Sequence, residues 1–405
     1  MAKCINFSLE LMRFLYRETT NIVLSPLSLE IAALSILSGV KNASFDEMRD
    51  SIFDMKISLR NINDFSSALK SIISEIKSLQ DMEFKMYNFI YISSKYKLNE
   101  QYMNNVTKNL DTSLKLVNFE DTSLELYNMI DAEVSDATMG RINKVIQNVP
   151  TVSNMLLINS TTLQVNESRQ SISSATSSKQ LKQLFKSSYE GRTSIATTTE
   201  YDKAMDISFS VHNGQFKYYH DNEQGYTCVE LSYINANLNL ILILPKEGSS
   251  PRDIINQLSQ NKLQSISKLM ALKQLEIKIP IIKLKMNIDL AYVWQIIGIQ
   301  KIFDQDEADF SGLSTNPKGL CLESIIFNSE ISLNGNFKEK TVSQESSKSK
   351  SSSSSTNKKT GGKKSTTVLS VAFNRPFIYF VTCNIKEQRK VILFAGVVNN
   401  LLETN

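Results

Sequence analysis

The amino-acid sequence predicts an α+β domain, because helical patterns fill its first third and strand patterns fill its second half. Up to about residue 146, apolar residues recur at helical spacing. Beyond that point, β-branched and aromatic runs are bounded by Pro, Gly and Asn. The 405 residues exceed the usual size of a single core, but apart from one loop no linker divides them, so we expect one domain over residues 1–405.

The predicted helices carry local start and stop signals. The first 18 residues place apolar side chains at helical spacing with charges between them, which is typical of an amphipathic helix and not of a signal peptide. A helix over residues 26–39 has Pro26 in its first turn and Gly39 at its end. We expect two further helices, over residues 61–79 and 124–146.

The strand-like runs lie in the rest of the chain. Residues 240–244 form its best apolar run, which has the length of a buried strand and not of a membrane span. We expect strands over residues 155–163, 206–211, 229–233, 238–244, 275–286, 320–333, 368–373, 377–383 and 391–398. Many strands after a helical first part favour large antiparallel or mixed sheets.

Residues 343–367 form a low-complexity segment without one apolar side chain. Ser and Thr supply 14 of its 25 positions, Lys supplies six, and Glu345 is its single acidic residue. This composition cannot bury enough surface to offset the entropy of ordering it, so we expect an exposed loop. Because folded segments precede and follow it, this loop is either functional or an insertion within the domain.

The positive charge of the chain belongs to this loop. Residues 336–367 carry a net charge of +6, and the whole chain carries +4, which leaves about −2 for the remainder. A broad nucleic-acid surface is therefore not expected. A weak, local contact with polyanions stays open, through Lys358, Lys359, Lys363 and Lys364.

The sequence contains no catalytic or metal-binding pattern. His212 and His220 have no nucleophile or acidic partner at a characteristic spacing. Asp304, Asp306 and Asp309 lack the glycine and closing glutamate of a calcium loop, which favours a solvated acidic turn. We therefore expect no enzyme, no cofactor and no metal site.

The four cysteines are scattered and have no metal-type spacing, so we expect free thiols in a reducing compartment. With no signal peptide or membrane segment in the sequence, we expect a cytoplasmic protein without a membrane contact. Release by a non-classical route stays open.

A set of short motifs extends from the first helices to the last strand. In chain order they are Leu24-Ser-Pro-Leu-Ser-Leu-Glu, Val117-Asn-Phe119, Thr138-Met-Gly140, Asn159, Val229-Glu-Leu-Ser-Tyr233, Leu242-Ile-Leu-Pro245, Ala308-Asp-Phe-Ser-Gly312, Phe373-Asn-Arg-Pro-Phe377 and Leu393-Phe-Ala-Gly-Val-Val-Asn399. Each motif is modest, but together and in this order they resemble the serpin family, with likeness to its intracellular and poxvirus-type members.

The resemblance implies three β-sheets, about nine helices and a reactive-centre loop, here residues 335–372. In inhibitory members a protease cleaves this loop and becomes acylated. The loop then enters the main sheet as a new strand and carries the protease with it. The partner implied is a serine protease, and the protein is expected to be a monomer.

The hinge at the start of this loop departs from the inhibitory pattern. Alignment places Phe337 where a Gly is expected after Gly335, and Lys338 in place of a Thr. Strand alternation would turn Lys338 and Lys340 to one face of an inserted strand and Glu339 to the other. Burying an unpaired charge costs several kcal/mol, and Phe337 removes the flexibility of a Gly, so insertion is disfavoured. The loop is also longer than the resemblance leads us to expect.

The region where the main sheet opens is altered as well. Ser25, Ser28 and Asn159 match family positions there, but Phe327 replaces an expected His. The loss of a hydrogen-bonding His indicates a changed opening region, unless Phe327 merely fills a gap in the core.

Three functions remain open on this basis. The first is a non-inhibitory or substrate-like serpin-fold protein that binds a protease or another host protein. The second is a suicide inhibitor of a trypsin-like protease. Its scissile bond would follow Lys350, before Ser351, with Lys348, Lys359 and Lys364 as alternatives. The third is a polyanion-binding module that acts through the loop lysines.

Overall fold

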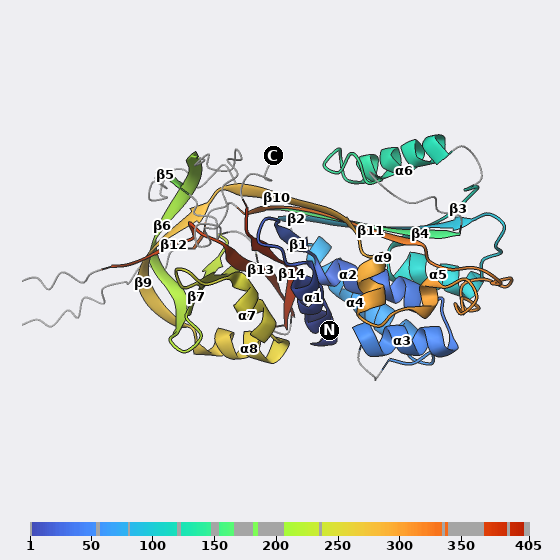
Figure 1. Ribbon diagram of the computed structural model, residues 1–405, viewed down its shortest axis with the longest axis horizontal. Helices are drawn as coiled ribbons and strands as arrows, with labels where there is room; N and C mark the ends of the chain where they lie inside the picture. The colour runs from blue at the N-terminus through green and yellow to red at the C-terminus, as the bar shows by residue number, and fades with distance from the viewer. Residues whose placement is uncertain are drawn as a thin grey trace, which may run out of the picture.

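In the computed structural model, a five-stranded sheet extends from a larger, curved nine-stranded sheet, and the helices pack around both (Figure 1). The structure describes residues 2–53, 57–79, 82–119, 123–146, 154–165, 181–184, 206–234, 237–333, 337–338, 368–386 and 389–400. An α+β fold is confirmed. Within these ranges there are nine α-helices, as expected.

Most helices lie in the first third of the chain. The described helices are α1 (Ala2–Leu15), α2 (Pro26–Leu37), α3 (Asn42–Ile52), α4 (Ile62–Lys77), α5 (Glu100–Asn109), α6 (Ser123–Ala137), and, later in the chain, α7 (Pro251–Gln257), α8 (Gln260–Leu269) and α9 (Ala291–Ile296). A short 3₁₀ turn, η2, spans Lys301–Phe303. All twelve residues of α2 are buried, which explains its small and apolar composition. Within the described ranges, none of the helices has both the length and the apolar character needed to cross a bilayer.

The five-stranded sheet forms the centre of the molecule (Figure 1). Its strands lie in the order β10 (Ile282–Asp289), β11 (Ser324–Leu333), β4 (Met155–Val165), β2 (Met82–Ser93) and β3 (Thr112–Val117). The two strands β11 and β4 are parallel and directly paired, from Ser324 opposite Leu156 to Ile331 opposite Leu163. A strand inserted between them from the end of β11 would turn back and run antiparallel to both.

The nine-stranded sheet completes the fold. Its order is β1 (Ile22–Leu24), β14 (Arg389–Val398), β13 (Phe377–Ile385), β8 (Leu238–Pro245), β7 (Tyr226–Ser232), β6 (Asp206–Asp221), β9 (Ala271–Pro280) and β12 (Leu369–Ala372), with β5 (Leu181–Leu184) also beside β6. The resemblance implied three sheets. Hydrogen bonding joins the described strands into two, because the 16-residue strand β6 pairs with both β7 and β9.

The two faces of the five-stranded sheet are covered differently. One face packs on the main core, which includes Leu163, Phe327 and Ile331. The other face carries α6, whose Ile130 and Val134 belong to a separate small cluster (Figure 1).

Several expected boundaries were wrong. The helix expected over residues 124–146 ends at Ala137, because Met139 and Gly140 adopt positive φ angles of 54° and 75° that no α-helix tolerates. The strand expected over residues 275–286 is two strands, β9 and β10, which belong to different sheets. The strands β1, β2 and β3 lie in the first third, where we expected helices, and the helix α5 of that region was not predicted.

Candidate functional site

A hydrogen-bonded cluster ties α2 to the centre of the five-stranded sheet. Ser28 of α2 donates a hydrogen bond from Oγ to Asn159 Oδ1 at 2.8 Å. It accepts one from Thr161 Oγ1 at 2.6 Å. Asn159 in turn donates from Nδ2 to Asn88 Oδ1 on β2. These four side chains are almost fully buried, so their bonds are protected from competition with water.

We expected four residues where the sheet opens, and three of them, Ser28, Asn159 and Phe327, lie together in the structure. Phe327 lies directly opposite Asn159 across the parallel β4–β11 pair and is fully buried. It belongs to the main hydrophobic core, which agrees with the interpretation that it fills core space. Ser25 is buried before the first turn of α2, and its hydroxyl has no hydrogen-bond partner in the described structure.

Sequence reasoning missed Thr161 and Asn88. Thr161 could have been found, because strand alternation places residue 161 on the same face as Asn159. Asn88 was missed together with its strand, although Met82, Phe84 and Met86 alternate there as in a half-buried strand.

The opposite face of the β4–β11 pair is also polar and buried. Asn328 lies opposite Ser160, and Glu330 lies opposite Thr162. Among the described residues, Ser160 Oγ, Thr162 Oγ1 and Asn328 Nδ2 are buried without a hydrogen-bond partner. Glu330 is held by Lys283 Nζ at 2.7 Å, from the neighbouring strand β10. The junction at which a strand would enter is therefore buried on both faces.

Of the residues that we expected to form the hinge, the structure describes Phe337 and Lys338. Phe337 forms an isolated antiparallel bridge with Tyr233, at the end of β7. Its ring is 4.7 Å from the Tyr233 ring and 5.0 Å from the imidazole of His212, between centroids. The Phe337 side chain is 4% exposed and belongs to the main core. The side chain that we expected to stiffen the hinge therefore also anchors it.

Lys338 follows this anchor. Its backbone N–H donates to the carbonyl oxygen of Ser232 at 2.7 Å, and its side chain is exposed. Gly335, Glu339 and Lys340 of the hinge lie outside the described residues. The reactive-site candidates Lys348, Lys350, Ser351, Lys359 and Lys364 also lie outside them.

The two histidines differ in environment. His212, on β6, is 5% exposed, and its Nε2 lies 3.0 Å from Ser210 Oγ. Burial lowers the pKa of His212 to about 4, so the imidazole is neutral at pH 7. His220 is exposed, and its Nδ1 lies 3.0 Å from Thr227 Oγ1. The proximity of His212 to the hinge had no sequence signal, because it depends on tertiary contacts.

The other expected residues have structural roles. Asp304 accepts hydrogen bonds from the backbone N–H groups of Asp306 and Glu307, and Asp309 accepts one from Asn42. Searched over the described ranges, the structure contains no group of His, Cys, Asp and Glu able to hold a metal ion. The thiols of Cys228, Cys321 and Cys383 are free and buried.

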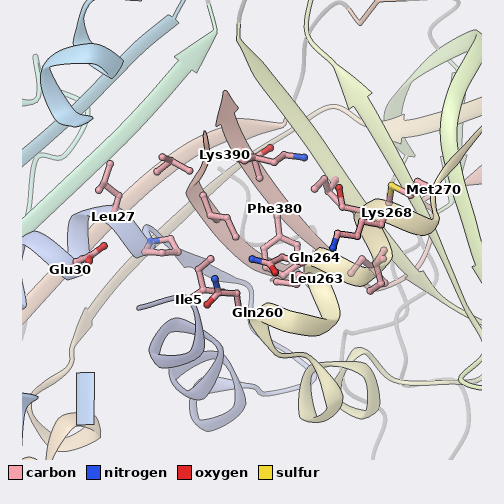
Figure 2. Close-up of a pocket in the computed structure, with 18 residues that line it drawn as sticks. Ile5, Leu27, Glu30, Gln260, Leu263, Gln264, Lys268, Met270, Phe380 and Lys390 are labelled. Atoms are coloured by element: carbon pink, nitrogen blue, oxygen red, sulfur yellow. The ribbon is translucent and has the colours of Figure 1, made fainter. Parts of the chain in front are cut away.

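A second feature is a cavity of about 400 Å³ between helices and the nine-stranded sheet (Figure 2). Its lining is mainly apolar and comes from α1, α2, α8 and the strands β8, β13 and β14. The lining residues are Ile5, Pro26, Leu27, Glu30, Ile241, Ile243, Gln260, Leu263, Gln264, Ile266, Ser267, Lys268, Met270, Phe380, Thr382, Lys390, Val391 and Ile392.

The charged groups of the cavity lie at its edges. Glu30 is beside Leu27 at one end, and Lys268 is beside Met270 at the other (Figure 2). Lys390 Nζ is bonded to Glu230 Oε2 at 2.9 Å, whereas Lys268 is exposed and has no ion-pair partner in the described structure. The cavity can therefore hold an apolar molecule with an acidic group near Lys268.

Comparison with known proteins matches almost the whole chain to one protein family. Residues 2–401 match the family model described as serpin (serine protease inhibitor). Serpin B10 of Sorex araneus is 22% identical over 98% of this chain and 98% of its own length.

Solved structures agree in fold. Uncleaved ovalbumin superposes with a TM-score of 0.79 at 18% identity, over 98% of this chain and 99% of its own. Thyroxine-binding globulin in complex with thyroxine superposes with a TM-score of 0.73 at 18% identity, over 99% of this chain and 98% of its own.

Proposed function

The chain belongs to the serpin family, and we propose that it is a non-inhibitory member whose reactive loop binds a protease or another protein without entering the central sheet. In this proposal the protein is not an enzyme. A trypsin-like protease that reaches the loop treats it as a substrate, and cleavage leaves the five-stranded sheet unchanged.

The burial of Phe337 carries this proposal. Insertion requires the segment after β11 to turn back between β11 and β4. Phe337 would then leave its contacts with Tyr233 and His212. Fully burying a phenylalanine side chain stabilises a protein by about 1.5 to 3 kcal/mol, and this is lost unless the new position buries the ring equally well.

The charges that follow Phe337 add to this barrier. At the end of the sheet nearest the hinge, the core face carries Leu163, Ile331 and Leu333, which are all buried. An inserted strand that turned Lys338 to the exposed side, near Gln164, would turn Glu339 onto that apolar face. The opposite register would bury Lys338 instead. Either choice buries an unpaired charge, at a cost of several kcal/mol.

Incubation with trypsin tests the proposal. We expect cleavage within residues 335–372, no SDS-stable adduct, and little change in melting temperature after cleavage. An adduct with trypsin would overturn the proposal and favour the suicide-inhibitor alternative. The Lys350→Ala variant would then show whether Lys350 precedes the scissile bond.

A second candidate function is the transport of a small apolar acid, and the cavity in Figure 2 favours it. Its volume of about 400 Å³ lies in the usual range of ligand sites. Phe380, Ile243 and Leu263 offer apolar surface, and Lys268 offers a cation at the edge. Thyroxine-binding globulin, a neighbour in fold, is known in complex with thyroxine.

Calorimetric titration with thyroxine and with dodecanoate tests this function. We expect saturable binding of at least one of the two. The Leu263→Trp variant, which fills the cavity, should lose this binding. Leu269→Trp is the matched control, because Leu269 is 58% exposed on the same helix and does not line the cavity. Absence of saturable binding, or binding that Leu263→Trp leaves intact, would contradict this function.

A further inference from the structure

Phe337 lies where β6 and β7 separate. The two strands pair from Lys217 opposite Glu230 to Asp221 opposite Tyr226, and β6 continues toward His212 without β7 beside it. Phe337 contacts both sides of this gap, since its ring touches His212 of β6 and its backbone bridges to Tyr233, just after β7. Phe337 and Lys338 thus dock on the nine-stranded sheet.

The surroundings of His212 favour a neutral ring. Across the sheet His212 faces Ile277 of β9, which is fully buried. The charged neighbours of Ile277, Lys278 and Glu276, pair with each other at 3.2 Å. Tyr233, just after β7, contacts the Phe337 ring, and burial raises the pKa of its phenol well above the usual value. On the loop, the side chain of Lys338 is exposed. Among the described groups, none offers a carboxylate to a protonated His212.

We propose that Phe337 is a latch that holds the start of the reactive loop against the nine-stranded sheet, and that protonation of His212 releases it. This proposal rests on the proposed function only in taking residues 335–372 as the reactive loop. Release would detach Phe337 and Lys338 from the nine-stranded sheet at acidic pH, and it would do so without strand insertion.

The direction of the pH effect follows from linkage. With the latch closed, burial holds the pKa of His212 at about 4. With Phe337 withdrawn, the imidazole reaches water and its pKa returns to about 6.5. A lowered pKa in the closed state means that the closed state is fully favoured above pH 6.5 and loses its advantage as the pH falls toward 4. Between pH 7 and pH 5, the open-to-closed ratio should rise about 20-fold.

Hydrogen exchange at the amide of Lys338 measures this ratio, because that N–H is bonded to Ser232 in the closed state. Its protection factor, corrected for the intrinsic exchange rate at each pH, should fall about 20-fold from pH 7 to pH 5. The amide of Thr315, bonded to the Lys97 carbonyl elsewhere in the molecule, should keep its protection factor.

The two histidines of the sequence provide matched variants. His212→Gln should abolish the pH response at Lys338, and His220→Gln should preserve it. If His212→Gln does not fold, Phe337→Ala gives a second measurement. We expect it to lower the protection of Lys338 at pH 7 and to remove the pH response, because His212 is then hydrated in both states.

A protection factor that does not change with pH, or that changes equally in His212→Gln, would overturn the latch. Neither result depends on adduct formation with trypsin. Failure of the latch is therefore distinguishable from failure of the proposed non-inhibitory function.

Discussion

At the scale of single residues, two serines at the start of α2 show that a buried hydroxyl stabilises the fold only when it has a hydrogen-bond partner. Ser28 bonds to Asn159 and Thr161. Ser25 is equally buried, but its hydroxyl has no partner in the described structure. A hydrogen bond contributes about 1 kcal/mol, whereas an unsatisfied buried group costs about 1 to 3 kcal/mol.

Replacing these serines by alanine should therefore have opposite results. Ser28→Ala removes the hydrogen bonds that Asn159 Oδ1 and Thr161 Oγ1 make with Ser28 Oγ, and we expect it to destabilise the protein by about 2 kcal/mol. Ser25→Ala removes a group that is already unpaired, so stability should stay the same or rise. Urea unfolding at pH 7 measures both. Equal destabilisation by the two changes would contradict the assigned hydrogen bonds.

At the scale of secondary-structure elements, Glu230 links three strands of the nine-stranded sheet. Glu230 lies on β7. Its carboxylate forms ion pairs with Lys217 Nζ of β6 at 2.8 Å and with Lys390 Nζ of β14 at 2.9 Å. Burial alone would raise the pKa of Glu230, but the two lysines hold it below its usual value. A depressed carboxyl pKa stabilises the fold above the unfolded value of about 4.3, and this contribution is lost as the pH falls through the folded value.

We expect Glu230→Gln to destabilise the protein at pH 7 by about 1 to 3 kcal/mol. The difference from the wild type should shrink as the pH is lowered below about 4.3, because Glu230 itself then becomes neutral. Chemical unfolding between pH 7 and pH 3 measures this. Glu223→Gln, at an exposed site in the turn between β6 and β7, should have little effect at any pH. A pH-independent difference for Glu230→Gln would contradict the ion-pair assignment.

The hinge is the second feature at the scale of elements. The combined change Phe337→Gly, Lys338→Thr, Glu339→Ala and Lys340→Ala removes the buried ring and all three charges. We expect this variant to gain loop insertion, seen as a rise in melting temperature after trypsin cleavage that the wild type lacks.

The matched control for the hinge is Lys358→Ala together with Lys359→Ala, which lowers the loop charge outside the hinge. It should behave as the wild type does. If the hinge variant also shows no rise in melting temperature, then the hinge is not what prevents insertion.

At the scale of the whole molecule, the described residues pack as two hydrophobic clusters of unequal size. The main cluster extends from Phe7 to Val398 and includes α2. The second joins α6 to one face of the five-stranded sheet through residues such as Ile130 and Val134. Elements with fewer buried contacts open at lower free energy, so α6 should open before the rest of the fold.

Native-state hydrogen exchange should show this order. We expect Val134→Ala, which removes buried methyl groups, to lower the protection of the α6 amides about 10-fold or more. The α2 amides should keep their wild-type protection. An equal loss in both helices would show that α6 and the main core open as one unit.

Local sequence patterns predicted the elements whose own residues carry the signal. The helix that begins at Pro26 and most strands of the second half lie close to where we expected them. The strands β9 and β10 were merged, because a turn between sheets leaves little trace in local composition. The strand β2 was missed although its apolar residues alternate at Met82, Phe84 and Met86. At the candidate site, Ser28 and Asn159 could be named in advance, but their bonds to Thr161 and Asn88 could not.

The sequence by itself determined the α+β class, the order of motifs that places the chain in its family, and the run of charges that follows Phe337, at residues 338–340. The tertiary structure alone decided that Phe337 is buried against His212 and Tyr233, and that Ser28 is bonded whereas Ser25 is not. The physical reason is that burial and hydrogen bonding depend on residues far apart in the chain, as His212 and Phe337 are. Composition and periodicity report what a residue is, but its energy in the fold depends on which distant groups surround it.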